Sequence, residues 1–245
     1  MNKKFLLISI IFLSISICNC LYPEPVKPTT IVDVPTAEVT EYSSYDLKFR
    51  LYGEGGVLSE MVFGVFKPIN IGISWDVDKL IGSGTTIDTR PPAILFKAKV
   101  FQGGMTIPAI AIGYSGQGYG SYNNTDETDS IPDTEPDKYQ NREKGVYLAL
   151  TQEYFVPGLE ITFGCNIYDF DKEGVYSFAG ITYGIENKLV FLSEYDNIRM
   201  APENRANLGL KLFVTDNVDV TITGRNLFRG PESERIAIIN YRGKF

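Results

Sequence analysis

The stretch RANLGLKLFVTDNVDVTITGR, residues 205–225, decides the fold. Apolar side chains alternate with polar or small ones up to Val214 and again from Val218 onward, with turn-forming residues at 215–217 between them. A period of two is typical of β-strands whose two faces meet different surroundings. The stretch therefore predicts two strands joined by a short turn.

The same alternation recurs along most of the chain. Ten further segments show it, at roughly 45–51, 57–66, 69–77, 94–100, 108–114, 145–155, 159–167, 175–185, 188–196 and 234–241. Short connections tend to alternate with longer ones, of which 115–144 is the longest and reads as a surface loop. Bacterial outer-membrane barrels have even strand numbers and this alternation of turns and loops. We therefore expect an all-β fold, an antiparallel up-and-down transmembrane β-barrel of about twelve strands.

The end of the chain supports a closed barrel. Phe245 is the last residue, and Ala237, Ile239 and Tyr241 precede it with the same parity. A last strand without a tail leaves an open edge, so we expect it to pair with the first strand. These four residues form the predicted C-terminal strand signal, with outer-membrane lipid and the barrel-assembly machinery as expected partners.

Alternation alone does not decide between a membrane and water. A soluble β-sandwich or lipocalin-like barrel would show the same pattern with its apolar face turned inward. Aromatic residues gather near the strand ends, among them Tyr45, Trp75, Tyr114 and Tyr183. An aromatic belt at both membrane interfaces would produce this distribution, and we expect localisation in the outer membrane.

The N-terminal region predicts export. Lys3 and Lys4 precede an apolar run that is too short to span a bilayer as a helix, so residues 1–20 read as a signal peptide. Acylation of Cys18 or Cys20 is the alternative reading. Residues 21–44 are rich in proline and read as an extended periplasmic lead-in, and 45–245 as the barrel.

Composition excludes several functional classes. The formal net charge of −7 argues against nucleic acid as a partner. The chain has no histidine, which removes Ser-His-Asp and Cys-His nucleophile sites and the common zinc sites. We therefore predict no enzyme activity, no catalytic residues, no cofactor and no metal. A paired-carboxylate mechanism would leave Glu194 and Asp196 as candidates, although they serve equally well as ion-pair partners.

Charged residues share the parity opposite the apolar one. A charge facing lipid at mid-depth costs about 2–4 kcal/mol, so these side chains should line the lumen. Because both signs occur, they either pair across a narrow interior and plug it or line a small aqueous pore. The predicted lumen residues are Asp46, Lys48, Arg50, Lys97, Lys99, Glu160, Glu194, Asp196, Arg205, Lys211, Asp219 and Arg225.

Several short segments resemble bacterial outer-membrane barrel proteins related to the YjbH-like, exopolysaccharide-associated family. They are Pro35–Ala37, Gly55-Gly56, Gly72–Asp76, Leu80–Gly82, Pro108–Tyr114, Lys144–Tyr147, Glu194–Asp196, Asn207–Gly209 and Arg235–Tyr241. The resemblance implies an outer-membrane barrel tied to polysaccharide export or surface assembly, and it supplies no active-site residues. We predict a non-enzymatic channel or assembly component. The alternatives are a soluble periplasmic or lipid-anchored binding module, or a barrel hydrolase.

Overall fold

The computed structural model describes residues 27–82, 86–123, 138–154, 156–168, 170, 174–186, 188–198, 204–228, 230 and 233–245. The predicted signal peptide and the two cysteines considered for acylation lie outside these residues. Within them, no helix has the length and apolar character needed to cross a membrane.

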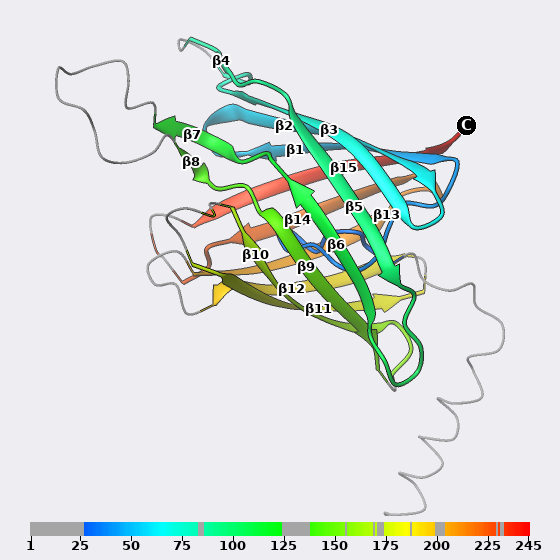
Figure 1. Ribbon diagram of the computed structural model, residues 1–245. Coiled ribbons are helices and arrows are strands. Elements are labelled where there is room, and N and C mark those ends of the chain that lie inside the picture. The colour runs from blue at the N-terminus through cyan, green and yellow to red at the C-terminus, as the bar shows by residue number, and fades with distance from the viewer. Residues whose placement is uncertain are drawn as a thin grey trace, which may run out of the picture.

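Twelve long strands in the described part of the chain form one sheet. Their bounds are β1 Ser44–Tyr52, β2 Gly56–Phe66, β3 Ile69–Asp78, β5 Ala93–Phe101, β6 Ala109–Ser115, β9 Gly145–Glu153, β10 Leu159–Ile167, β11 Tyr176–Ile185, β12 Leu189–Ile198, β13 Arg205–Phe213, β14 Val218–Arg225 and β15 Glu234–Lys244. Each pairs antiparallel with its neighbours along the chain, and β1 pairs with both β2 and β15. The sheet is therefore a closed up-and-down barrel of twelve strands (Figure 1), which confirms the predicted fold.

The predicted seam between the last and first strands is present. β15 pairs with β1 in a register that places Tyr241 opposite Leu47 and Ile239 opposite Phe49. Beyond the strand, the amide of Phe245 donates to the carbonyl of Ser43 over 3.0 Å. The rings of Phe245 and Tyr45 stack at a centroid distance of 6.5 Å. The C-terminal residues thus close the ring.

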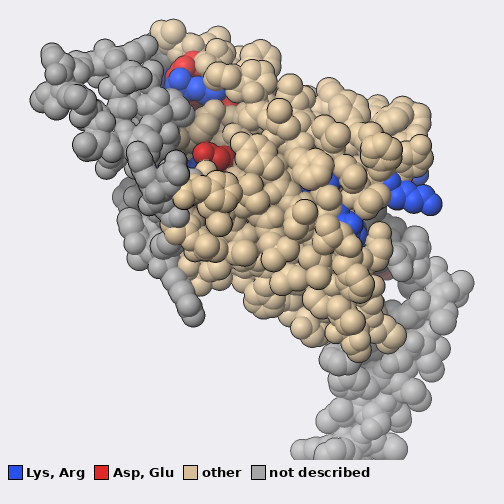
Figure 2. Space-filling model, in the orientation of Figure 1, with Lys and Arg blue, Asp and Glu red and all other residues tan. Residues whose placement is uncertain are grey.

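The barrel is apolar outside and mainly polar inside, apart from buried apolar clusters such as that of Phe178 and Leu192. On β14, Ile222 is 60% exposed, whereas its neighbours Thr221 and Thr223 are 2% and 1% exposed. Apolar side chains face outward on other strands as well, since Phe163, Ile73 and Leu208 are each at least half exposed. On the face shown in Figure 2, charged side chains appear toward the two ends and the surface between them is mostly uncharged. The alternating sequence pattern therefore turns its apolar side outward.

The two ends of the barrel differ. Short turns such as 67–68 and 214–217 lie at the end that carries the C-terminus, and the longer connections lie at the opposite end (Figure 1). The connection 115–144, read from sequence as a loop, contains a two-stranded hairpin of β7 Tyr119–Asn123 and β8 Lys138–Asn141. The remaining short elements are the 3-10 turn Gly53–Gly55 and β4 Asp88–Thr89, which extends β3.

The N-terminal segment departs from its prediction as a periplasmic lead-in. Residues 27–40 run inside the ring of strands (dark blue in Figure 1), where Ile31, Val32, Val34 and Ala37 are buried. The segment folds back on itself, because Thr30 and Pro35 form a β-bridge and the amide of Ile31 donates to the carbonyl of Val34 over 2.9 Å. We call residues 29–36 the luminal hairpin. The proline content predicted an extended segment but gave no sign that the segment lies inside the barrel, where small wall residues leave room for the hairpin.

Candidate functional site

The candidate functional site is the barrel interior. All twelve charged residues named from the sequence point inward and are buried or half-buried. Asp46, Arg50, Lys97, Glu160, Glu194, Asp196, Asp219 and Arg225 are buried, and Lys48, Lys99, Arg205 and Lys211 are half-buried. Strand alternation places them there, since each shares its parity with buried residues such as Thr221 and Asn207.

Several of these residues pair with one another or with nearby charges on the wall. Lys48 contacts Glu60 at 2.7 Å, Arg242 contacts Asp46 at 2.9 Å, and Lys211 lies 3.5 Å from Asp219. Lys144 forms an ion pair with Asp196. Buried charges are less costly in proteins when an opposite charge lies beside them, and each of these residues has such a partner.

Glu194 holds the tip of the luminal hairpin. Its carboxylate accepts hydrogen bonds from the backbone amides of Val32, Asp33 and Val34 over 2.9, 2.9 and 3.0 Å, and from the Asn207 side-chain amide over 2.6 Å. A carboxylate that receives several N–H groups makes charge-assisted bonds, which are roughly twice as strong as neutral ones. The residue considered for paired-carboxylate chemistry is thus engaged with the backbone of the hairpin.

Close packing accompanies this bond network. Ile31, Val32 and Val34 of the hairpin form one buried cluster with Ala149, Phe178, Val190 and Leu192 of the wall. A Cβ at Gly180 would lie 2.2 Å from Cδ1 of Ile31, so the Ile31 side chain would have to shift to make room for one. The small residues on this part of the inner wall therefore match the shape of the hairpin.

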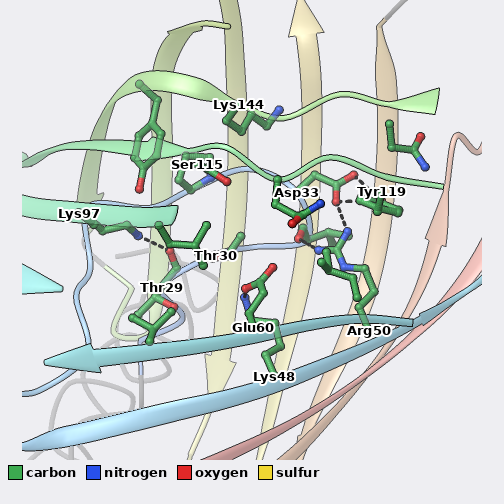
Figure 3. A pocket seen from close by; sticks show the side chains of 18 of the residues that line it. Thr29, Thr30, Asp33, Lys48, Arg50, Glu60, Lys97, Ser115, Tyr119 and Lys144 are labelled. Carbon is green, nitrogen blue, oxygen red and sulfur yellow. Dashed lines mark hydrogen bonds and ion pairs between the residues drawn. The ribbon is translucent and has the colours of Figure 1, made fainter. Parts of the chain in front are cut away.

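Asp33 sits at the centre of a second network. Its carboxylate forms ion pairs with Arg50 (Figure 3) and, at 2.7 Å, with Nε of Arg225. The Tyr119 hydroxyl donates to the same carboxylate over 3.2 Å, and both guanidinium groups lie over the Tyr119 ring at 4.7 and 5.2 Å. Burial alone would raise the pKa of Asp33, but Arg225 and Arg50 hold that pKa well below its ordinary value. Asp33 is therefore a carboxylate anion clamped between two arginines.

Lysine side chains fix the base of the hairpin. Nζ of Lys97 donates to the carbonyls of Thr29, Thr36 and Glu38 over 2.7, 3.2 and 3.1 Å. Lys99 pairs with the Glu38 carboxylate at 2.5 Å. Lys97 and Lys99 belong to the wall, whereas Lys27 belongs to the N-terminal segment and forms an ion pair with Glu160 of the wall at 3.0 Å. Wall and segment are thus joined by charged contacts along the length of the lumen.

A cavity of about 130 Å³ remains between the hairpin and the wall. Its lining includes seven cationic and three anionic residues, although the whole chain carries a net charge of −7. The cations are Lys48, Arg50, Lys97, Arg142, Lys144, Arg205 and Arg225, and the anions are Asp33, Glu60 and Asp196. The cavity is therefore positive inside an acidic protein, which favours anions as its occupants.

Sequence reasoning missed several residues of this site, among them Glu60, Asp33 and Tyr119. Glu60 has the parity of the inward-facing Leu58 and Val62, so the alternation of β2 could have identified it. Asp33 lies in a segment without periodicity, and Tyr119 lies in the connection read as a loop. No local pattern marks either of them.

No protein-family model and no curated protein matches this chain. Among solved structures, a KdgM porin is similar over 81% of this chain and 98% of its own, at 13% identity and a TM-score of 0.49. A KdgM porin in complex with disordered oligogalacturonate is similar over 82% and 99%, at 11% identity and a TM-score of 0.47. A triple mutant of the Rhodopseudomonas blastica porin matches 78% of this chain and 55% of its own, at 11% identity and a TM-score of 0.35.

Proposed function

We propose that this chain is a non-enzymatic outer-membrane β-barrel channel whose lumen is filled by its own luminal hairpin. The observation that carries the proposal is the inversion of polarity across the barrel wall. Ile222 is 60% exposed while Thr221 and Thr223, on either side of it, are almost fully buried. A water-soluble barrel would bury its apolar face, whereas acyl chains accept it on the outside.

The orientation follows from the connections. In outer-membrane barrels the short turns face the periplasm and the longer loops face outward. Both Ser44, where β1 begins, and Phe245 lie at the end with short turns. The N-terminal segment thus enters the lumen from the periplasmic side, and the β7–β8 hairpin stands on the cell surface. A signal peptide at residues 1–20 would deliver the chain to this location.

A channel is favoured over an enzyme by how the interior carboxylates are used. Glu194 binds three backbone amides, and Asp196 pairs with Lys144. In the described residues the occupant of the lumen contacts the wall through hydrogen bonds, ion pairs and apolar packing, and its polar contacts can be exchanged for water or solute. The barrel hydrolase that the sequence left open therefore has less support than a gated pore.

We extend the proposal to polysaccharide export or surface assembly. Two observations support this step, namely the resemblance to exopolysaccharide-associated barrels and the positive cavity, which suits acidic sugars. Cells that lack the chain should release less acidic polysaccharide into the medium than cells that carry it. Equal amounts from both strains would remove this part of the proposal and leave the channel untouched.

Membrane fractionation combined with a heat-shift gel tests the channel itself. The chain should be recovered in the outer-membrane fraction, require detergent for extraction, and migrate differently before and after boiling. Recovery in the soluble periplasmic fraction would overturn the proposal in favour of a binding module.

A further inference from the structure

We infer that Arg50 and Arg225 form a binding site for the carboxylate of an acidic sugar, and that Asp33 occupies this site in the closed barrel. The inference rests on the proposed channel function and adds a ligand class and a site to it. A ligand carboxylate that takes the place of Asp33 would release the tip of the luminal hairpin.

The geometry around Asp33 is that of a bound anion. One carboxylate oxygen accepts a hydrogen bond from Arg50, and the other accepts one from Nε of Arg225 over 2.7 Å. Arg50 lies on β1 and Arg225 on β14, the two strands that flank β15, so the carboxylate bridges them. Tyr119 donates a further hydrogen bond over 3.2 Å. Arginine is the side chain best suited to carboxylates, because its planar fork offers several donors. Asp33 thus serves as an internal stand-in for a ligand carboxylate.

The two arginines retain capacity beyond what Asp33 uses. Nε of Arg50 and Nη2 of Arg225 are buried and have no hydrogen-bond partner among the described residues. Both side chains are at most 4% exposed. Buried donors normally find an acceptor, so two unused N–H groups at one site indicate that an acceptor is missing. A sugar carboxylate with its neighbouring hydroxyl oxygens would supply more acceptors than one aspartate.

The site borders a space that a ligand can enter. Arg50, Arg225 and Asp33 all line the cavity of about 130 Å³. The lining of this cavity also includes Lys97, which binds the base of the hairpin. Figure 3 shows Arg50 and Tyr119 around Asp33, and Lys97 directed at Thr29. The Tyr119 ring already carries both guanidinium groups, which keeps the arginines in place when Asp33 leaves. The arginine pair is therefore organised for an anion without the hairpin.

Titration calorimetry with sodium glucuronate tests the site directly. Asp33→Asn keeps the shape of the side chain and removes its charge, so glucuronate no longer competes with the Asp33 carboxylate, while Glu234 stays at 3.3 Å from Arg225 in both chains. We expect glucuronate to bind this variant at least about tenfold more tightly than the unchanged mature chain, since a charge-assisted bond is involved. Adding Arg225→Gln should abolish the gain. The control Asp219→Asn removes another buried lumen carboxylate, away from the arginine pair, and should bind like the unchanged chain.

Conductance of the unchanged chain in planar bilayers provides a second measurement, which needs no folded variant. Glucuronate should increase the open fraction relative to glucose with an equal concentration of sodium chloride. Equal affinities of the unchanged chain and a correctly heat-shifted Asp33→Asn variant would overturn the inference while leaving the channel standing, as would equal effects of glucuronate and glucose. A chain that never enters the membrane would instead overturn the proposed function.

Discussion

At the scale of single residues, the wall of the barrel is shaped for the hairpin it contains. Gly180 faces Ile31 so closely that a Cβ would lie 2.2 Å from the Ile31 side chain. Polar contacts accompany this packing. Glu194 of the wall binds the backbone of the hairpin, and Asp33 of the hairpin forms ion pairs with arginines of the wall. A few positions therefore determine whether the lumen is filled.

We expect Gly180→Ala to weaken docking of the luminal hairpin. Overpacking of a well-packed core costs about 1–3 kcal/mol, and Ile31 would have to shift within its buried cluster to relieve it. The channel should therefore open more often in planar bilayers than the unchanged protein does. Ile31→Val removes the Cδ1 atom that the new methyl group meets, so the double variant should return toward the original open fraction. No difference between the single and double variants would contradict this packing account.

The charges of the lumen were readable from the sequence, whereas their occupant was not. Strand alternation fixes the direction of side chains such as Lys97 and Asp219, because a one-residue shift would put them into the apolar face. Asp33 shows no such periodicity, and its role depends on Arg50 and Arg225, which are 17 and 192 residues away in sequence. Contacts of this kind come from the tertiary fold alone.

At the scale of elements, the barrel and the hairpin are separable. The twelve strands pair with one another, β3 also pairs with the short β4, and no barrel strand pairs with the hairpin in the described residues. The hairpin in contrast depends on the wall for Glu194, Lys97 and the packing of Ile31. The closed ring was predictable from alternation and from the pairing required of the last strand. The insertion of the segment before β1 was not, since prolines indicate an extended chain without saying where it lies.

Deletion of residues 27–40 should leave the barrel intact and open its lumen. The variant should still show the heat-dependent shift on a gel, because the β1–β15 seam begins at Ser44. Its conductance in planar bilayers should rise well above that of the unchanged chain and remain open at all times. A matched control replaces Lys188, an exposed turn residue, by Gln and should change neither property. A deleted chain that folds and yet conducts no more than the original would show that the hairpin is not what closes the lumen.

At the scale of the whole molecule, everything depends on what the outer surface of the barrel contacts. The exposed apolar side chains of the twelve strands form a surface that water would disfavour and acyl chains would accept. Sequence alternation could not reveal this, because a soluble barrel has the same period with the faces exchanged. The structure shows which side of each strand faces outward, because on β14 Arg225 is buried in the lumen whereas Ile222 is exposed on the outer surface.

A charge placed on the outer surface separates the two environments. Ile222 lies within β14, so Ile222→Lys should cost about 2–4 kcal/mol if lipid surrounds it. Val214, at the turn before β14, is 64% exposed, and Val214→Lys should cost only about 0–1 kcal/mol because it lies near an interface. Urea unfolding of the barrel in lipid vesicles, followed by the heat-shifted band, measures both costs. In a water-soluble protein both exposed residues would accept lysine within about 0.5 kcal/mol. Equal and small effects of the two substitutions would therefore contradict a membrane location, and a large effect confined to Ile222 would locate the acyl chains against the middle of the strands.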